Sequence, residues 1–99
     1  MKTQSLKTLA EYLEMSFDNG ASVLLMQMCA GNCAIYVGDT TKPQDKWKYH
    51  GDISADVAAE ILSVTHTGPN RIVVEGQKYR FFRRFAHFED RGATVFSMG

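Results

Sequence analysis

Residues 78–88 have the sequence KYRFFRRFAHF, in which aromatic and cationic side chains interleave. Because successive side chains of a β-strand point to opposite faces, this spacing predicts a long strand with two different faces. We expect Tyr79, Phe81 and Phe85 to lie under helices. A bulge near Phe82-Arg83 would instead shift the alternation and bury more rings. Without a bulge, the open face carries cations and rings together: Lys78, Arg80, Phe82, Arg84, Ala86 and Phe88.

The segments on either side of this strand predict a three-stranded meander. Residues 71–75 are rich in β-branched side chains and precede Gly76 and Gln77, which predict a turn. Beyond the aromatic strand, residues 89–92 predict a second turn and residues 93–98 a third strand.

The N-terminal part predicts a helix followed by a hairpin. Residues 5–17 place apolar side chains at helical spacing, and the charged side chains lie off that stripe. Asp18-Asn19-Gly20 is a typical helix stop. Residues 22–28 and 33–37 are short apolar runs around Gly31 and Asn32, which suit a tight turn.

A third strand and a second helix follow. Residues 47–50 alternate like a strand with one wet face. Ser54 is a typical N-cap and Asp56 lies in the first turn that it would cap. The second helix is expected to end before residues 67–70, which are Thr-Gly-Pro-Asn.

The predicted order αβββαβββ indicates the α+β class. We expect a single domain, residues 1–99, with two helices packed on one face of an antiparallel β-sheet. An offset of 49 residues aligns residues 9–13 with 58–62 at three identities in five, which suggests a pseudo-repeat of halves at about 1–51 and 52–99. The alternative is that any two amphipathic helices leading into apolar strands would look this similar.

The strand at residues 22–28 is apolar on both faces, so we expect it to be covered on both sides. The second cover is either a loop or another subunit. In the second case the chain is a homodimer that self-associates through Leu24, Met26 and Met28.

Composition and charge restrict the class of protein. The 99 residues, 44% of them hydrophobic, suffice for one core, and eleven basic side chains balance eleven acidic ones. Six of the basic and three of the acidic residues fall within residues 71–91, so the charge is locally uneven. The longest apolar region, residues 21–37, is shorter than the ~20 residues of a membrane-spanning helix. The N-terminus has the wrong order of charges for a secretory signal, so we expect a cytoplasmic protein.

The cationic and aromatic strand predicts the function. Arg and aromatic residues are enriched at the centres of protein interfaces. We therefore predict a small non-enzymatic inhibitor, adaptor or regulator, in which the residues that bind a protein partner are Lys78, Arg80, Phe82, Arg84 and Phe88. The alternative is a single-stranded nucleic-acid-binding module, whose rings stack on bases while its cations hold phosphates.

Chemistry beyond binding finds little support in the sequence. Cys29 and Cys33 lack the spacing of a redox pair, and the three histidines lack zinc-ligand spacing. His50 and Asp52 lie close in sequence, and together with the cysteines they are the candidate residues of a third functional alternative, an enzyme. We predict no enzymatic activity, no metal and no cofactor.

Overall fold

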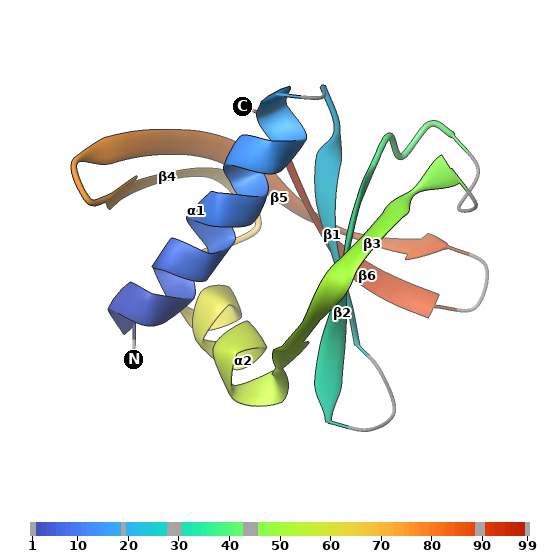
Figure 1. Cartoon of the computed structure of the whole chain (residues 1–99), viewed down its shortest axis with the longest axis horizontal. Helices are drawn as coiled ribbons and strands as arrows, with labels where there is room; N and C mark the ends of the chain where they lie inside the picture. Colours follow the sequence, from blue (N-terminus) through green and yellow to red (C-terminus); the bar gives the residue numbers. More distant parts are fainter. Residues whose placement is uncertain (1, 19, 28–30, 43–45, 89–90, 99) are drawn as a thin grey trace.

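The computed structural model describes residues 2–18, 20–27, 31–42, 46–88 and 91–98, and within them the α+β class and the order αβββαβββ are confirmed (Figure 1). Neither helix has the length and apolar character that a membrane crossing would require. In chain order the elements are α1 (Lys2–Asp18), β1 (Ser22–Gln27), β2 (Asn32–Gly38), β3 (Lys48–Ser54), α2 (Ala55–Val64), β4 (Gly68–Val74), β5 (Gln77–Phe88) and β6 (Arg91–Met98).

The six strands form one sheet in the order β3-β2-β1-β6-β5-β4, and every neighbouring pair is antiparallel. The central pair, β1 and β6, joins the two three-stranded meanders. In Figure 1, β4 and the first half of β5 extend beside α1, while the end of β5 and the start of β6 extend to the opposite side. The offset of 49 residues aligns β1 with β4, yet β1 is central and β4 is an edge strand.

The helix ends follow from local sequence. At the end of α1, the N–H of Ala21 donates to the carbonyl of Ser16 at 2.8 Å and that of Gly20 to Phe17 at 3.2 Å. Gly20 has a φ of 63°, so the pair of bonds forms the left-handed helix stop that the sequence predicts. Ser54 caps α2 because its side chain accepts from the N–H of Val57 at 3.2 Å, as predicted.

Several predicted boundaries are shifted in the structure; β4, for example, begins at Gly68 rather than at residue 71. The turn between β4 and β5 uses Glu75 and Gly76, rather than Gly76 and Gln77, with φ values of 50° and 80°. Positive φ at both central residues is the turn geometry that matches the twist of a hairpin. β3 begins at Lys48 and continues to Ser54, so Trp47 lies outside the strand in which we expected it.

The larger core cluster joins both helices to the sheet. Leu13, Phe81 and Phe96 are among its most completely buried members, and the two rings lie 5.7 Å apart. Its buried residues are Leu9, Ala10, Leu13, Val23, Leu25, Cys33, Ile35, Ala58, Ile61, Ile72, Val74, Tyr79, Phe81 and Phe96.

A second, smaller cluster lies around the alternate residues of β1. Leu24 and Met26 are 0% and 2% exposed, and they pack with Ala93, Val95 and Trp47. Within the described chain, the residue Trp47 of the segment before β3 packs over these side chains. Of the residues expected to mediate self-association, Leu24 and Met26 are buried within the chain, and Met28 lies outside the described residues.

Candidate interaction site

The alternation of β5 matches the expected faces in its first half. Tyr79 and Phe81 are buried in the larger cluster, while Lys78, Arg80 and Phe82 are exposed. The pairing of β5 with both neighbours runs without a bulge, so the alternative near Phe82-Arg83 is not adopted.

The expectation for Phe85 is wrong. Its side chain shares the face of Tyr79 and Phe81 but is 64% exposed, and it does not belong to the cluster that includes side chains of both helices. The helix-facing position before it belongs to Arg83, whose Nη1 donates to the carbonyls of Leu62 and Thr65 at 3.0 and 2.7 Å and to the Thr65 hydroxyl at 3.0 Å. These bonds complete the C-terminal end of α2, where helix carbonyls lack partners of their own.

The register of the β4–β5 hairpin adds residues to the exposed face. Arg71 lies opposite Arg80, Val73 opposite Lys78, and Pro69 opposite Phe82. Cross-strand partners share a face, so the exposed surface extends over both strands. We call this surface the cationic face, and its residues are Pro69, Arg71, Val73, Lys78, Arg80 and Phe82. Arg71 and Val73 were not predicted to belong to this face, although the predicted turn gives them the same face by alternation.

The cationic face carries unneutralised charge. Within the described part of the chain, Arg71, Lys78 and Arg80 make neither an ion pair nor a side-chain hydrogen bond. Arg71 and Arg80 also line an open hollow of about 470 Å³, together with Pro69, Asn70, Phe81 and Phe82. Phe82 is 46% exposed, so an aromatic surface lies among the cations. Guanidinium groups in such a position bind carboxylates or phosphates in a two-pronged geometry.

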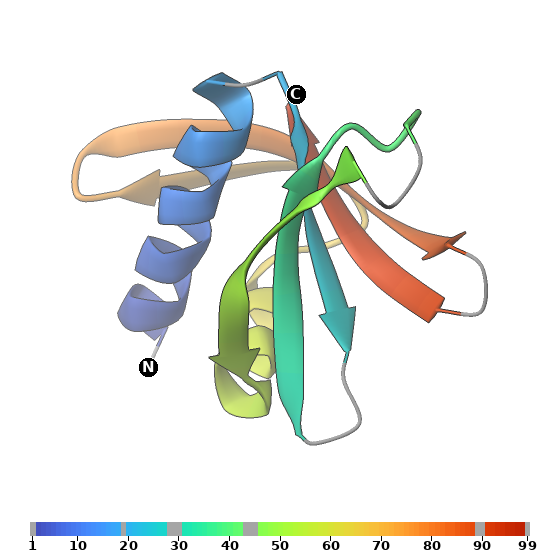
Figure 2. The ribbon, with the colours of Figure 1, turned by 45° about the vertical axis from the view of Figure 1, so that its right-hand side comes forward.

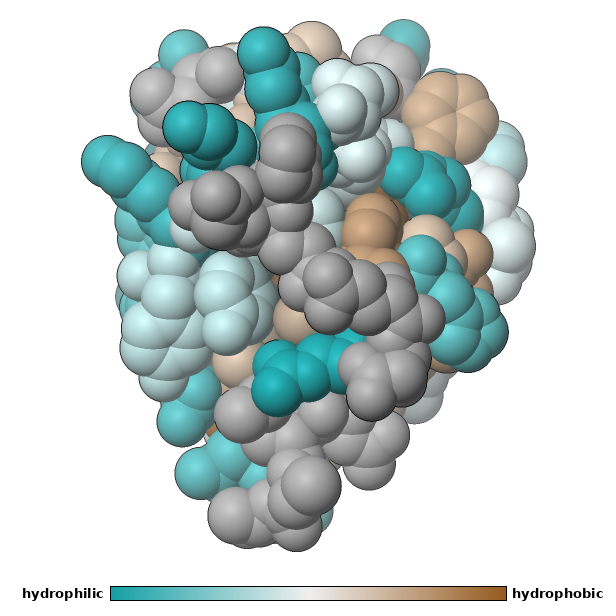
Figure 3. All heavy atoms as spheres, turned by 90° about the vertical axis from the view of Figure 1, so that its right-hand side faces the viewer, coloured by the Kyte–Doolittle hydropathy of each residue, from teal (hydrophilic) through white to brown (hydrophobic). Residues whose placement is uncertain are grey.

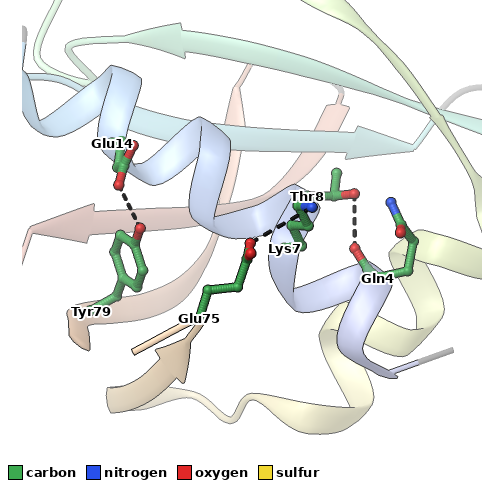
Figure 4. Close-up of polar contacts among 6 residues, drawn as sticks. All are labelled: Gln4, Lys7, Thr8, Glu14, Glu75 and Tyr79. Carbon is green, nitrogen blue, oxygen red and sulfur yellow. Dashed lines mark hydrogen bonds and ion pairs between the residues drawn. The ribbon is translucent and has the colours of Figure 1, made fainter. Parts of the chain in front are cut away.

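The hairpin that carries this face is tied to α1. Tyr79 donates its hydroxyl proton to Glu14 Oε1 at 2.6 Å, and Lys7 Nζ lies 3.7 Å from Glu75 Oε1 (Figure 4). The hydrogen bond to Glu14 is the main cause that raises the pKa of Tyr79 to about 12. These contacts lie on the side of the hairpin that faces α1, so they do not cover the cationic face.

Arg84 and Phe88, also predicted as binding residues, are already engaged within the chain. Arg84 Nη2 donates to Thr40 Oγ1 at 3.1 Å. The Phe88 ring packs edge-on against Trp47 with centroids 4.7 Å apart. These two residues therefore border the second cluster, and the cationic face ends before them.

The loop between β2 and β3 holds that border in place. Asp39 Oδ1 accepts from the N–H and hydroxyl of Thr41 at 2.9 and 2.7 Å. These hydrogen bonds lower the pKa of the Asp39 carboxyl. Trp47 Nε1 donates to the carbonyl of Asp39 at 3.0 Å, so the ring is oriented by the same loop.

Among the described residues of the enzymatic alternative, no side-chain hydrogen bond joins His50, Asp52 and Cys33. Asp52 accepts from the Tyr49 hydroxyl at 2.5 Å, and the side chain of His50 has no hydrogen-bond partner among the described residues. Cys33 is buried, which raises the pKa of its thiol, and Cys29 lies outside the described residues. In the described ranges no three His, Cys, Asp or Glu side chains lie close enough to hold a metal ion.

The chain matches no known family model, no curated protein and no solved structure.

Proposed function

We propose that this chain is a small cytoplasmic, non-enzymatic interaction protein, an inhibitor, adaptor or regulator, that binds an acidic surface of a protein partner through the cationic face. The observation that carries the proposal is that Arg71, Lys78 and Arg80 lie on the same face as the half-exposed ring of Phe82 and make no ion pairs to the rest of the described chain. An interface with a carboxylate-bearing partner supplies the missing counter-charges.

The layers of the fold support this role. Both helices contribute side chains to the cluster that contains Tyr79 and Phe81, which supports a sheet with the helices on one face. The alternate residues Lys78, Arg80 and Phe82 then project from the opposite face. That face is covered by Trp47 near β1 and the second half of β5, and is open over β4 and the first half of β5.

A protein partner fits this surface better than a nucleic acid. Single-stranded binding proteins stack successive bases on several exposed rings, and each stack is worth about 1–3 kcal/mol. The cationic face offers the one ring of Phe82, because Phe88 packs against Trp47. Arginine with an aromatic residue beside a shallow hollow is instead the usual composition of an interface centre.

The test is site-specific photo-crosslinking in the cells that make the protein. A photoreactive phenylalanine analogue replaces Phe82 in one variant and Tyr49 in the control, because Tyr49 is also an exposed aromatic residue but lies on β3. We expect a discrete crosslinked protein from position 82 and none from position 49. Adding Arg71→Glu and Arg80→Glu should abolish the crosslink, whereas Lys42→Glu and Lys48→Glu, at exposed sites elsewhere, should retain it. A crosslink that survives Arg71→Glu and Arg80→Glu would contradict the proposal.

The nucleic-acid alternative uses the same surface and is tested separately. Fluorescence anisotropy with labelled single-stranded RNA and DNA across a salt series would show binding that weakens as salt rises. The decisive comparison is between two triple variants. If salt-sensitive binding is lost in Arg71→Ala/Arg80→Ala/Phe82→Ala and kept in Lys42→Ala/Lys48→Ala/Tyr49→Ala, nucleic-acid binding replaces protein binding as the proposed function.

A further inference from the structure

The outer part of β5 has a neighbour on one side only. β6 pairs with residues 81–88 of β5, whereas β4 pairs with residues 77–83 and begins at Gly68, opposite Arg83. Residues 84–88 therefore lie at an edge of the sheet that β4 leaves uncovered. Residues 84–86 are backed by β6 and β1, and beyond them the end of β5 and the start of β6 extend as a two-stranded ribbon (Figures 1 and 2). This edge is distinct from the cationic face, which lies on the other half of β5.

The register identifies the backbone groups that face this open edge. In a hairpin with a two-residue turn, the closing pair is hydrogen-bonded, and bonded pairs then alternate along the strands. Here the closing pair is Val74 and Gln77, so the odd-numbered residues of β5 direct their N–H and C=O groups toward β4. Pro69 agrees with this alternation, because it occupies a position whose nitrogen faces solvent. Beyond Arg83, the backbone groups of Phe85 and His87 thus face the open side, and no described residue bonds to them.

β4 is prevented from continuing along this edge. Gly68 has a φ of 102°, and the chain before it leads from α2. The Asn70 side chain holds this turn, since its Oδ1 accepts from the N–H of His66 at 3.0 Å and its Nδ2 donates to the carbonyls of His66 and Gly68 at 2.6 and 3.1 Å. β4 therefore does not pair with residues 84–88.

The side chains at the edge leave the backbone accessible. The Phe85 ring lies over Gly92 of β6, where an added Cβ would come within 2.6 Å of Phe85 Cζ. The same ring meets His87 edge-on at a centroid distance of 5.1 Å. The contact with Gly92 directs Phe85 toward β6 and away from the open side, while the contact with His87 runs along β5. Figure 3 faces the end of the molecule where β5 and β6 connect, and hydrophobic atoms reach its surface among hydrophilic ones.

The other two edges of the sheet carry features that discourage strand pairing. β3 has an irregular register opposite Ile35 and Tyr36, and β4 contains Pro69. Bulges and prolines are the usual protection of edge strands. Residues 84–88 contain no proline, and their pairing with β6 is regular. The cation on this segment, Arg84, is bound to Thr40 on the face of the sheet rather than placed along its edge.

We propose that two copies of this chain pair antiparallel through residues 84–88 of β5, about a two-fold axis at Ala86. Phe85 of each copy lies opposite His87 of the other, and these two bonded pairs exchange four N–H···O=C hydrogen bonds. The open groups are symmetric about Ala86, so a second copy satisfies all of them at once. The two alanines form the close, non-bonded pair on the axis, and the sheets join into one of twelve strands.

The pairing is short, so the dimer is expected to be weak and dependent on concentration. Stable interfaces bury about 1,200–2,000 Å² in total, and five residues of strand bury less. The two Arg84 side chains lie at opposite ends of the paired segment, about 13 Å apart along the strands. This distance exceeds the screening length at physiological salt, about 8 Å, so their repulsion is small.

Sedimentation velocity over a concentration series tests the dimer. His87→Pro removes one edge donor without touching the β6 ladder, while Val73→Pro removes an outward-facing N–H from the edge of β4 and serves as the matched control. We expect the wild type and Val73→Pro to dimerise and His87→Pro to shift the dissociation constant upward at least tenfold. A wild type that remains monomeric up to about 1 mM would overturn the proposal. Equal dimerisation by His87→Pro would overturn it as well.

A cysteine at the axis provides a second readout that does not depend on how His87→Pro folds. Opposed Cα atoms of a non-bonded antiparallel pair lie about 4.5 Å apart, within the range that a disulfide spans. Under mild oxidation, Ala86→Cys should give a covalent dimer, while the wild type and Val73→Cys should give at most background. Failure of Ala86→Cys to crosslink at concentrations where the protein sediments as a dimer would refute the β5 geometry. A variant with Arg71→Ala and Arg80→Ala should still dimerise, which separates this inference from the proposed function.

Discussion

Replacing Trp47 with alanine removes the side chain that closes the second cluster over β1. Trp47 is 8% exposed and packs against Phe88 and Tyr36, at centroid distances of 4.7 and 6.5 Å. A ring of this size buries about 250 Å², which corresponds to about 6 kcal/mol at about 25 cal/mol per Å². The alanine methyl and partial collapse of the cavity recover some of this, so we expect the free energy of unfolding to fall by about 4 kcal/mol.

The assay is urea unfolding followed by far-UV circular dichroism, because Trp47 is the one tryptophan of the chain and its loss removes the fluorescence signal. Trp47→Phe is the control, since it keeps an aromatic ring but loses the 3.0 Å hydrogen bond to Asp39. We expect the control to lose about 1–2 kcal/mol. A loss below about 1 kcal/mol for Trp47→Ala would refute the conclusion that this loop covers a second core.

Two further substitutions test contacts between the helices and β5. Tyr79→Phe removes the hydrogen bond to Glu14 and should lower the free energy of unfolding by about 1 kcal/mol at neutral pH. The pKa of Tyr79 is raised from 10.0 to about 12 in the folded state, so this stabilisation is present below pH 10 and lost as pH rises toward 12. Urea unfolding should therefore show that the difference in free energy of unfolding between wild type and Tyr79→Phe decreases between pH 10 and 12. Arg83→Leu removes the donor to the carbonyls of Leu62 and Thr65 and should lower the free energy of unfolding by about 2–3 kcal/mol in the same assay. Arg83→Lys should recover part of this loss. An unchanged urea midpoint for Arg83→Leu would contradict the capping role.

The sequence predicted the elements that depend on neighbours along the chain. The stop at Gly20, the cap at Ser54 and the alternating faces of β5 all arise from interactions within a few residues. Such interactions are encoded locally, so propensity and spacing suffice to find them. The shift of the turn to Glu75 was missed because a left-handed conformation at a residue other than glycine is uncommon.

The errors concern what covers each face. Alternation placed Phe85 on the same face as Phe81, but it cannot say how far along β5 the helices reach. Apolar side chains on both faces of the strand around Leu24 indicated that both faces are buried, but the sequence pattern did not identify Trp47 as the side chain that packs there. The cationic face was found in its β5 half alone, because Arg71 joins it through cross-strand register.

The sequence by itself therefore determined the class, the element order and the side of β5 on which each charge lies. Only the tertiary structure decided that β1 pairs with β6, that a loop of the same chain covers β1, and where β4 leaves β5 unpaired. Strand order and coverage depend on contacts between residues far apart in the chain, whose pairing a local pattern does not encode. Both candidate sites lie on parts of β5 that the rest of the described chain leaves exposed.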